Sequence, residues 1–183
     1  MLIKSGIILL LISLKFNYSK RLKKLLQKIR LNYFLIPLLV IITGSAASYF
    51  AQTGRVWYKT INLPIWIWTP SNTLMLAAWA VIFILSSFAV LIVWNRYSEQ
   101  KNFRLIMTLF ILNAVINIGW YILFFGHQQI GLAFFQAVLL VSNVVLLIVL
   151  IWKFCPLAAT CLLPYSLWVV FSTILTLNVW LMN

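Results

Sequence analysis

The sequence predicts an all-α membrane protein: a bundle of five transmembrane helices preceded by a basic amphipathic N-terminal segment. Hydrophobic residues make up 64% of the chain and charged residues only 8%, with a mean hydropathy of +1.06. In soluble domains roughly a quarter of the residues are charged. The apolar residues gather in five runs, each near or above the ~20 residues that a helix needs to cross a bilayer. The basic residues lie between these runs.

The formal charge of +13 comes from fourteen Lys and Arg against one acid, Glu99. A balance this basic could indicate a nucleic-acid-binding protein. The basic residues, however, lie in short segments between apolar runs, where Lys and Arg set topology and meet anionic lipid headgroups. We therefore expect the lipid bilayer, and no nucleic acid, as their partner.

Residues 1–31 are predicted to form a separate extension on the inner membrane face. The apolar run at 6–14 is too short to span as a helix, and no small-residue cleavage site follows it. In the basic stretch that comes next, apolar side chains repeat with helical period at Leu22, Leu25, Leu26 and Ile29. The pattern is typical of an amphipathic helix on an anionic leaflet. A solvated stop signal that only fixes orientation is the alternative.

Residues 32–183 are predicted to form the transmembrane domain. The five predicted spans cover residues 33–51, 73–94, 103–125, 131–152 and 157–181. Trp94, Trp152 and Trp180 fall at span ends, where amphipathic rings prefer to sit at the membrane interface. Prolines and glycines inside such helices are tolerated when neighbours satisfy the freed backbone groups.

The distribution of basic residues predicts the orientation. With the N-terminus inside, eleven Lys and Arg flank the spans on the inner side, and only Arg55 and Lys59 lie outside. Cytoplasmic loops carry the excess of basic residues. We therefore expect a multi-pass protein with a cytoplasmic N-terminus, an external C-terminus and an outer loop at residues 54–72.

Polar and aromatic side chains recur along one face of four spans. Such groups are costly inside a membrane and usually face the interior of the bundle. The four stripes, spaced at helical intervals, are Trp79, Phe83, Ser86 and Val90; Asn113, Asn117, Trp120 and Phe124; Gln136 and Asn143; and Tyr165, Trp168, Ser172 and Thr176. For Asn143 and Ser86 we expect hydrogen bonding between helices, the commoner use of such residues.

Four other stripe residues suggest a ligand pocket, because large inward-facing aromatic rings beside an amide suit a flat, mostly apolar ligand with polar groups. They are Trp79, Asn117, Trp120 and Trp168. Carboxylates of such a ligand would reach Arg55 or Lys59 at the outer rim. In the first span, small residues at Gly44, Ala47, Ser48 and Ala51 permit close helix approach, either within the bundle or between two protomers.

The usual catalytic groups are missing. The sequence has no Asp, one Glu and one histidine, His127, so no carboxylate pair, metal cluster or nucleophile–base pair can be assembled. Cys155 and Cys161 lie six positions apart on different sides of a helix and are not expected to pair. We expect no metal and no required cofactor, so that any chemistry would have to come from the ligand.

Several motifs, in their order along the chain, resemble the TspO/MBR family of tryptophan-rich sensory proteins, which includes the mitochondrial translocator protein. They are A-S-Y-F at 47–50, W-Y at 57–58, N-I-G-W-Y-I-L-F-F-G at 117–126 and P-L-A-A-T-C-L-L-P-Y-S-L-W-V-V-F at 156–171. The resemblance covers residues 37–181. It implies a five-helix bundle, often a homodimer. It also implies binding of tetrapyrroles such as protoporphyrin IX or haem, of sterols and of isoquinoline or benzodiazepine-type drugs. We expect the protein to lie in a bacterial inner membrane.

The resemblance also implies which residues line a pocket closed by the first loop. They are Trp79, Phe83, Asn117, Trp120, Gln136, Tyr165, Trp168 and Phe171. Phe83 stands where the family often has tyrosine, and Gln136 where it often has an acid. The loop pattern K-P-x-W-x-P-P is broken into L-P-I-W-I-W-T-P-S, so that either Trp66 or Trp68 takes the family's loop position.

Three functions are compatible with these features. The first is a receptor or sensor that binds a tetrapyrrole. The second is light-dependent porphyrin degradation, in which the resemblance implies that Trp79 and Trp168 are the residues concerned. The third is transport through an interior lined by Asn113, Asn117, Gln136 and Asn143, which we rank last because no intramembrane charge could serve as a coupling site.

Overall fold

The structure is a computed structural model that describes residues 32–63 and 71–183. The chain divides into two compact units, Met1–Leu35 and Ile36–Asn183. Only residues 32–35 of the first unit are described, as the start of a helix, and everything below concerns the second unit. The predicted extension at 1–31, and Trp66 and Trp68, lie outside the described residues.

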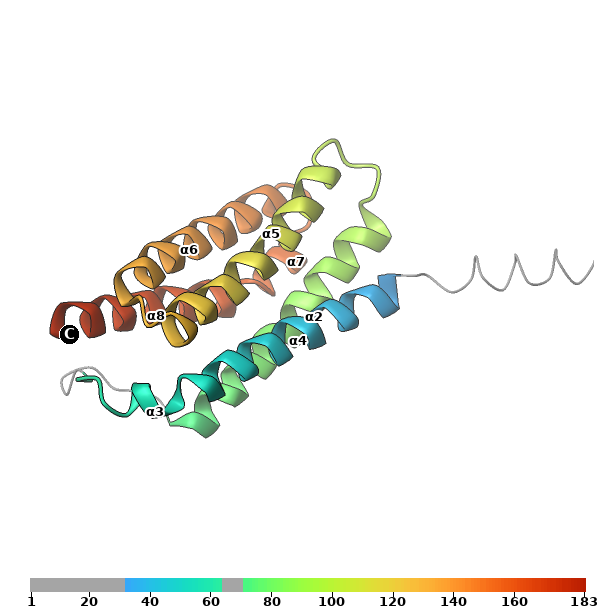
Figure 1. Ribbon diagram of the computed structural model, residues 1–183. Helices are drawn as coiled ribbons and strands as arrows, with labels where there is room; N and C mark the ends of the chain where they lie inside the picture. Colours follow the sequence, from blue (N-terminus) through green and yellow to red (C-terminus); the bar gives the residue numbers. More distant parts are fainter. Residues whose placement is uncertain (1–31, 64–70) are drawn as a thin grey trace, which may run out of the picture. The chain divides into compact units, whose positions relative to one another are not determined.

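Every regular element of the described residues is a helix (Figure 1). Among the described residues, five helices are long and apolar enough to cross a membrane, which confirms the predicted all-α membrane fold with five spans. The elements are α2 (Asn32–Thr53), α3 (Arg55–Tyr58), α4 (Asn72–Arg96), α5 (Phe103–Tyr121), the π-helical turn η1 (Ile122–Gly126), α6 (Ile130–Trp152), α7 (Pro156–Thr160) and α8 (Leu163–Met182). The predicted spans match these bounds closely.

Two spans are less regular than the sequence suggested. The third ends in η1, where the His127 N–H donates to the Ile122 carbonyl at 2.8 Å, five residues back. The fifth is interrupted between α7 and α8, because Pro164 has no N–H and its ring would clash with the Thr160 carbonyl in a continuous helix. The Leu162 N–H bonds three residues back instead, at 3.0 Å, which tightens the turn.

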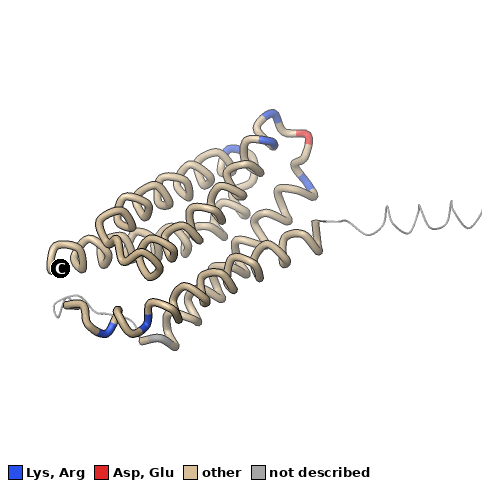
Figure 2. Tube along the Cα trace, in the orientation of Figure 1, with Lys and Arg blue, Asp and Glu red and all other residues tan. Residues whose placement is uncertain are grey.

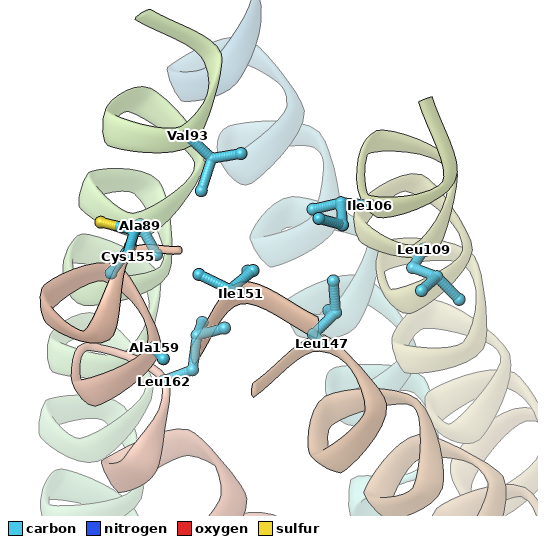
Figure 3. Packing of buried hydrophobic residues seen from close by; sticks show 10 residues of the cluster. Ala89, Val93, Ile106, Leu109, Leu147, Ile151, Cys155, Ala159 and Leu162 are labelled. Carbon is cyan, nitrogen blue, oxygen red and sulfur yellow. The ribbon is translucent and has the colours of Figure 1, made fainter. Parts of the chain in front are cut away.

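Small and branched apolar side chains hold α4, α5, α6 and α7 together at the end of the unit where α4 connects to α5 (Figure 3). Ile106, Leu147 and Ile151 are among the largest fully buried side chains. Ala89 and Ala159 are also fully buried, and residues this small let helix backbones approach closely. Cys155 and Cys161 are both free thiols, as predicted.

The charged residues of the described part lie at helix ends and in connections, with none along the middle of a span (Figure 2). Trp94 and Trp152 lie at the ends of α4 and α6 and are 39% and 49% exposed. This arrangement suits a bundle that crosses a bilayer, because charges are costly in the hydrocarbon and amphipathic rings favour its boundary. The direction of insertion stays a prediction.

Gly54 brings the end of α2 against η1. A Cβ at this position would lie 2.7 Å from Phe125 Cβ, 2.8 Å from its carbonyl oxygen and 2.9 Å from its Cα. These neighbours are mostly backbone atoms, which cannot rotate away as the end of a side chain could. The absent side chain therefore sets how closely the first loop approaches η1.

We expect Gly54→Ala to destabilise the protein by about 1–3 kcal/mol, because the added methyl forces the two backbones apart. Gly44→Ala is the matched control, since a Cβ there meets only Phe83 at an ordinary 3.7 Å. Thermal unfolding in detergent, followed by circular dichroism, measures both variants. Equal melting temperatures for the two variants would contradict the close approach at Gly54.

Candidate ligand-binding site

Trp79 of α4 and Trp168 of α8 pack against one common group of buried side chains, which includes Tyr165 and Val169. The Trp79 ring centroid lies 6.2 Å from that of Tyr165 and 5.6 Å from that of Phe83. The Trp168 centroid lies 5.8 Å from that of Phe171. Five predicted pocket residues thus occupy one region, called here the tryptophan cluster: Trp79, Phe83, Tyr165, Trp168 and Phe171.

Helix periodicity explains how each helix contributes to this cluster. Trp79 and Phe83 are four residues apart on α4, and Tyr165 and Trp168 are three apart on α8, so that each pair shares a face. Large rings from two helices then meet where both faces turn inward. A group of this kind offers broad aromatic surfaces to a flat ligand.

A chain of hydrogen bonds runs beside the tryptophan cluster and links α5, α6 and α8. Asn117 Nδ2 donates to Tyr165 Oη at 3.4 Å, and the Tyr165 hydroxyl donates to Asn113 Oδ1 at 2.9 Å. Asn113 Nδ2 donates to Asn143 Oδ1 at 2.9 Å. Asn143 Nδ2 completes the chain by donating to the Leu109 backbone carbonyl at 3.3 Å. Asn143 therefore bonds between helices, as the sequence predicted.

Three buried polar atoms in this part of the bundle have no hydrogen-bond partner among the described residues: Asn117 Oδ1, Trp168 Nε1 and Ser86 Oγ. The expected interhelical bond of Ser86 is thus not present. Leaving a buried polar atom unpaired is unfavourable by about 1–3 kcal/mol. An acceptor on Asn117 and a donor on Trp168 are therefore left unpaired inside the protein.

Gln136 of α6 lies against α5. Its Nε2 donates to the Ile116 carbonyl at 3.0 Å, and a Cβ on Gly119 would overlap that same nitrogen. Gly119 thus leaves the space in which the amide reaches the neighbouring backbone. In this structure Gln136 connects two helices, and its predicted contact with a ligand stays a prediction.

Trp120 lies in a second aromatic group, at the first loop. Its ring stacks on Phe124 at a centroid distance of 4.9 Å, and Trp57 of α3 meets the same Phe124 edge-on at 5.5 Å. Tyr58 lies 6.2 Å from Phe124. Burial raises the pKa of the Tyr58 phenol above its ordinary value. We call these four residues, Trp57, Tyr58, Trp120 and Phe124, the loop aromatic group.

The first loop is also tied to the end of α8. The Asn62 N–H donates to Asn183 Oδ1 at 2.9 Å, and Asn183 Nδ2 donates to the Asn62 carbonyl at 3.0 Å. Arg55 and Lys59, the predicted carboxylate contacts, lie in and directly after α3 and are exposed. Both are therefore accessible to an anionic group at this end of the bundle.

Tyr121 was missed by the sequence analysis although it connects the two aromatic groups. Its ring centroid lies 6.5 Å from that of Trp79 and 5.1 Å from that of Trp120. Tyr121 follows Asn117 by four residues on α5, so it continues the polar stripe that the sequence revealed. Applying that spacing consistently would have identified it.

The described residues contain no group of three or more His, Cys, Asp or Glu side chains that could hold a metal ion. The aromatic rings and the unpaired polar atoms are the chemical features that the site offers. They suit binding by stacking and hydrogen bonding.

Comparison with known proteins adds independent information. The model of the TspO/MBR family matches residues 34–181. The tryptophan-rich protein TspO of Archaeoglobus fulgidus is 31% identical over 80% of this chain and 93% of its own length. TspO of Bacillus cereus is 31% identical over 75% of this chain and 87% of its own length. The human translocator protein is 27% identical over 82% of this chain and 87% of its own length.

We expect Tyr165→Phe to lower the free energy of unfolding by about 1–2 kcal/mol, because the lost hydroxyl bonds two asparagines in an apolar interior. Tyr49→Phe is the matched control, since Tyr49 is 64% exposed on α2. Denaturant titration in detergent compares the two variants. A Tyr165→Phe protein as stable as the Tyr49→Phe protein would show that the hydrogen-bond chain contributes nothing.

Proposed function

The chain belongs to the TspO/MBR family of membrane proteins, and we propose that it is a multi-pass membrane receptor or sensor that binds a tetrapyrrole at the tryptophan cluster. Protoporphyrin IX and haem are the expected ligands. The family relationship supports a membrane receptor or sensor role. The proposal for the ligand rests on the residues that the cluster brings together.

One observation carries the proposal: Trp79 and Trp168 pack against the same cluster of buried residues, and Trp168 Nε1 and Asn117 Oδ1 lack partners among the described residues. Flat aromatic ligands gain most from offset or edge contacts with large rings. A tetrapyrrole has an extended π-surface and carries nitrogen and carboxylate groups. It would gain aromatic contacts and could satisfy polar atoms that are unpaired without it.

The first loop supplies the remaining features of the proposed site. Trp57 and Tyr58 lie on Phe124, and Tyr121 connects that group to Trp79. A ligand at the tryptophan cluster could extend its carboxylates to Arg55 or Lys59 at the exposed end. Carboxylates at the rim would stay hydrated while the ring lies among the aromatic side chains.

The proposal includes the setting of the site. The excess of basic residues on one side favours a cytoplasmic N-terminus in a bacterial inner membrane, with the first loop outside. A homodimer is also proposed. The small-residue face of α2 packs partly within the bundle, where Ala47 is buried and Gly44 lies close to Phe83, so a second protomer would contact the exposed residues of α2.

We expect protoporphyrin IX to quench the tryptophan fluorescence of the purified protein, with Trp79→Phe and Trp168→Phe each weakening binding about fivefold. The loss corresponds to ~1 kcal/mol of aromatic contact. Trp94→Phe is the control, because Trp94 contacts Phe103 near the α4–α5 connection. Equal affinities in all three variants and the wild type would remove the tryptophan cluster from the binding site.

Light-dependent breakdown of a bound porphyrin is a second candidate function, favoured by the same packing of Trp79 and Trp168 against common neighbours. In this reaction dioxygen would be the oxidant, and the two indoles would act on the excited porphyrin. The expected result is a protein-dependent loss of the porphyrin absorption band under illumination in air, reduced in Trp79→Phe and Trp168→Phe. Identical bleaching with and without protein would exclude this activity and leave binding intact.

A further inference from the structure

The hydrogen-bond chain fixes which way the amide of Asn117 faces. Its far end is the Leu109 backbone carbonyl, which can only accept a hydrogen bond. The atom of Asn143 beside that carbonyl must therefore be the donor Nδ2, at 3.3 Å. The other end of the Asn143 amide is then the acceptor Oδ1.

Each following link is determined by the one before it. Asn113 must present Nδ2 to Asn143 Oδ1, which leaves Asn113 Oδ1 facing Tyr165. Tyr165 has a single hydroxyl proton and donates it to that oxygen at 2.9 Å. Its Oη can therefore only accept from Asn117, so the atom of Asn117 at 3.4 Å is Nδ2. Reversing any amide would set two donors or two acceptors against each other.

The last atom of the chain is Asn117 Oδ1. Asn117 is 3% exposed, and this oxygen has no hydrogen-bond partner among the described residues. Its partner Tyr165 contacts the ring of Trp79, so the unpaired acceptor belongs to the same region as the tryptophan cluster. Hydrogen bonds arranged head to tail polarise one another. A hydrogen bond that a further donor makes to Asn117 Oδ1, at the open end of the chain, is strengthened as a result.

We propose that Asn143 and Asn113 are positioning residues that make the site selective for ligands that donate a hydrogen bond. The inference rests on the proposed function and narrows its ligand class. An opened tetrapyrrole with an outward-facing pyrrole or lactam N–H can donate to Asn117 Oδ1. A closed porphyrin cannot make this hydrogen bond, because its N–H groups point to the centre of the ring, and haem has no such N–H. Both would be held by ring contacts and rim carboxylates alone, without the bond that the chain favours. The selecting element is a backbone carbonyl on α5, connected to the site through residues of α5, α6 and α8.

Carbazole and dibenzofuran form a matched pair of probes, because both are flat tricyclic molecules that differ in having N–H or oxygen at one position. Retention of each probe by nanodiscs containing the full-length protein is measured relative to empty nanodiscs, which removes partitioning into lipid. We expect the wild type to retain carbazole about tenfold more tightly, since dibenzofuran leaves the buried acceptor unpaired. Equal affinities for the two probes would overturn the proposal.

Asn143→Leu tests the positioning role, because it breaks the chain at a residue that is separated from Asn117 by Tyr165 and Asn113. We expect the tenfold preference to fall to about twofold or less, since Asn113 and then Asn117 can reverse. Asn113→Leu breaks the chain at another link and is the test variant if Asn143→Leu does not fold. Ser142→Ala is the control, because the Ser142 hydroxyl is exposed and bonds within its own helix. A preference that persists in the chain-breaking variants would overturn the positioning role.

Protoporphyrin quenching tests the proposed function separately from this selectivity. If the protein distinguishes carbazole from dibenzofuran but does not bind protoporphyrin, the selectivity is supported and the proposed tetrapyrrole function is overturned. If it binds protoporphyrin but retains both probes equally, the proposed function is supported and the role of Asn143 is overturned.

Discussion

The hydrogen-bond chain from Asn117 to the Leu109 carbonyl is the constraint on which the site depends. In a bundle that crosses lipid, polar side chains find partners mainly in neighbouring helices, because the hydrocarbon offers none. Tyr165 bonds two asparagines of α5, and Asn143 joins the same chain from α6. A shift of one helix turn would break several of these bonds at once. The chain therefore fixes the axial register of three helices.

That register places the aromatic residues. With Tyr165 held by Asn113 and Asn117, its ring lies against Trp79, and Trp168 follows one turn along α8. Close packing around Ala89 and Ile151 holds the helices together near the α4–α5 connection (Figure 3), and the loop aromatic group attaches the first loop to η1. The tryptophan cluster includes and packs against a third set of buried residues. The apolar packing holds the helices together, and the unpaired polar atoms near the tryptophans are the groups through which we propose that a ligand is recognised.

The five spans could be predicted from the sequence because hydropathy and length alone decide whether a helix can cross a bilayer. The inward faces followed from helical spacing, which correctly grouped Trp79 with Phe83 and Tyr165 with Trp168. The partners of Asn113 and Asn143 could not be predicted, since their contact depends on the relative heights of α5 and α6. Trp120 shares a stripe with Asn117 but lies in the loop aromatic group, because its stacking partner Phe124 faces Trp57. The break before α8 was not predicted. Pro164 causes it, but Pro37 lies inside the continuous α2, so a proline alone does not show where a span is interrupted.

Solid-state NMR of the full-length protein in lipid bilayers, with labelled asparagine and tyrosine, can show the direction of the hydrogen-bond chain. We expect strong magnetisation transfer from the side-chain NH2 hydrogens of Asn117 to the Tyr165 ring carbon that carries the hydroxyl. We also expect transfer from the Asn113 NH2 hydrogens to the Asn143 side-chain carbonyl carbon. If the Asn113 NH2 hydrogens, in place of those of Asn117, contact the Tyr165 ring carbon that carries the hydroxyl, the chain runs in the opposite direction, and Asn117 Oδ1 is not its open end.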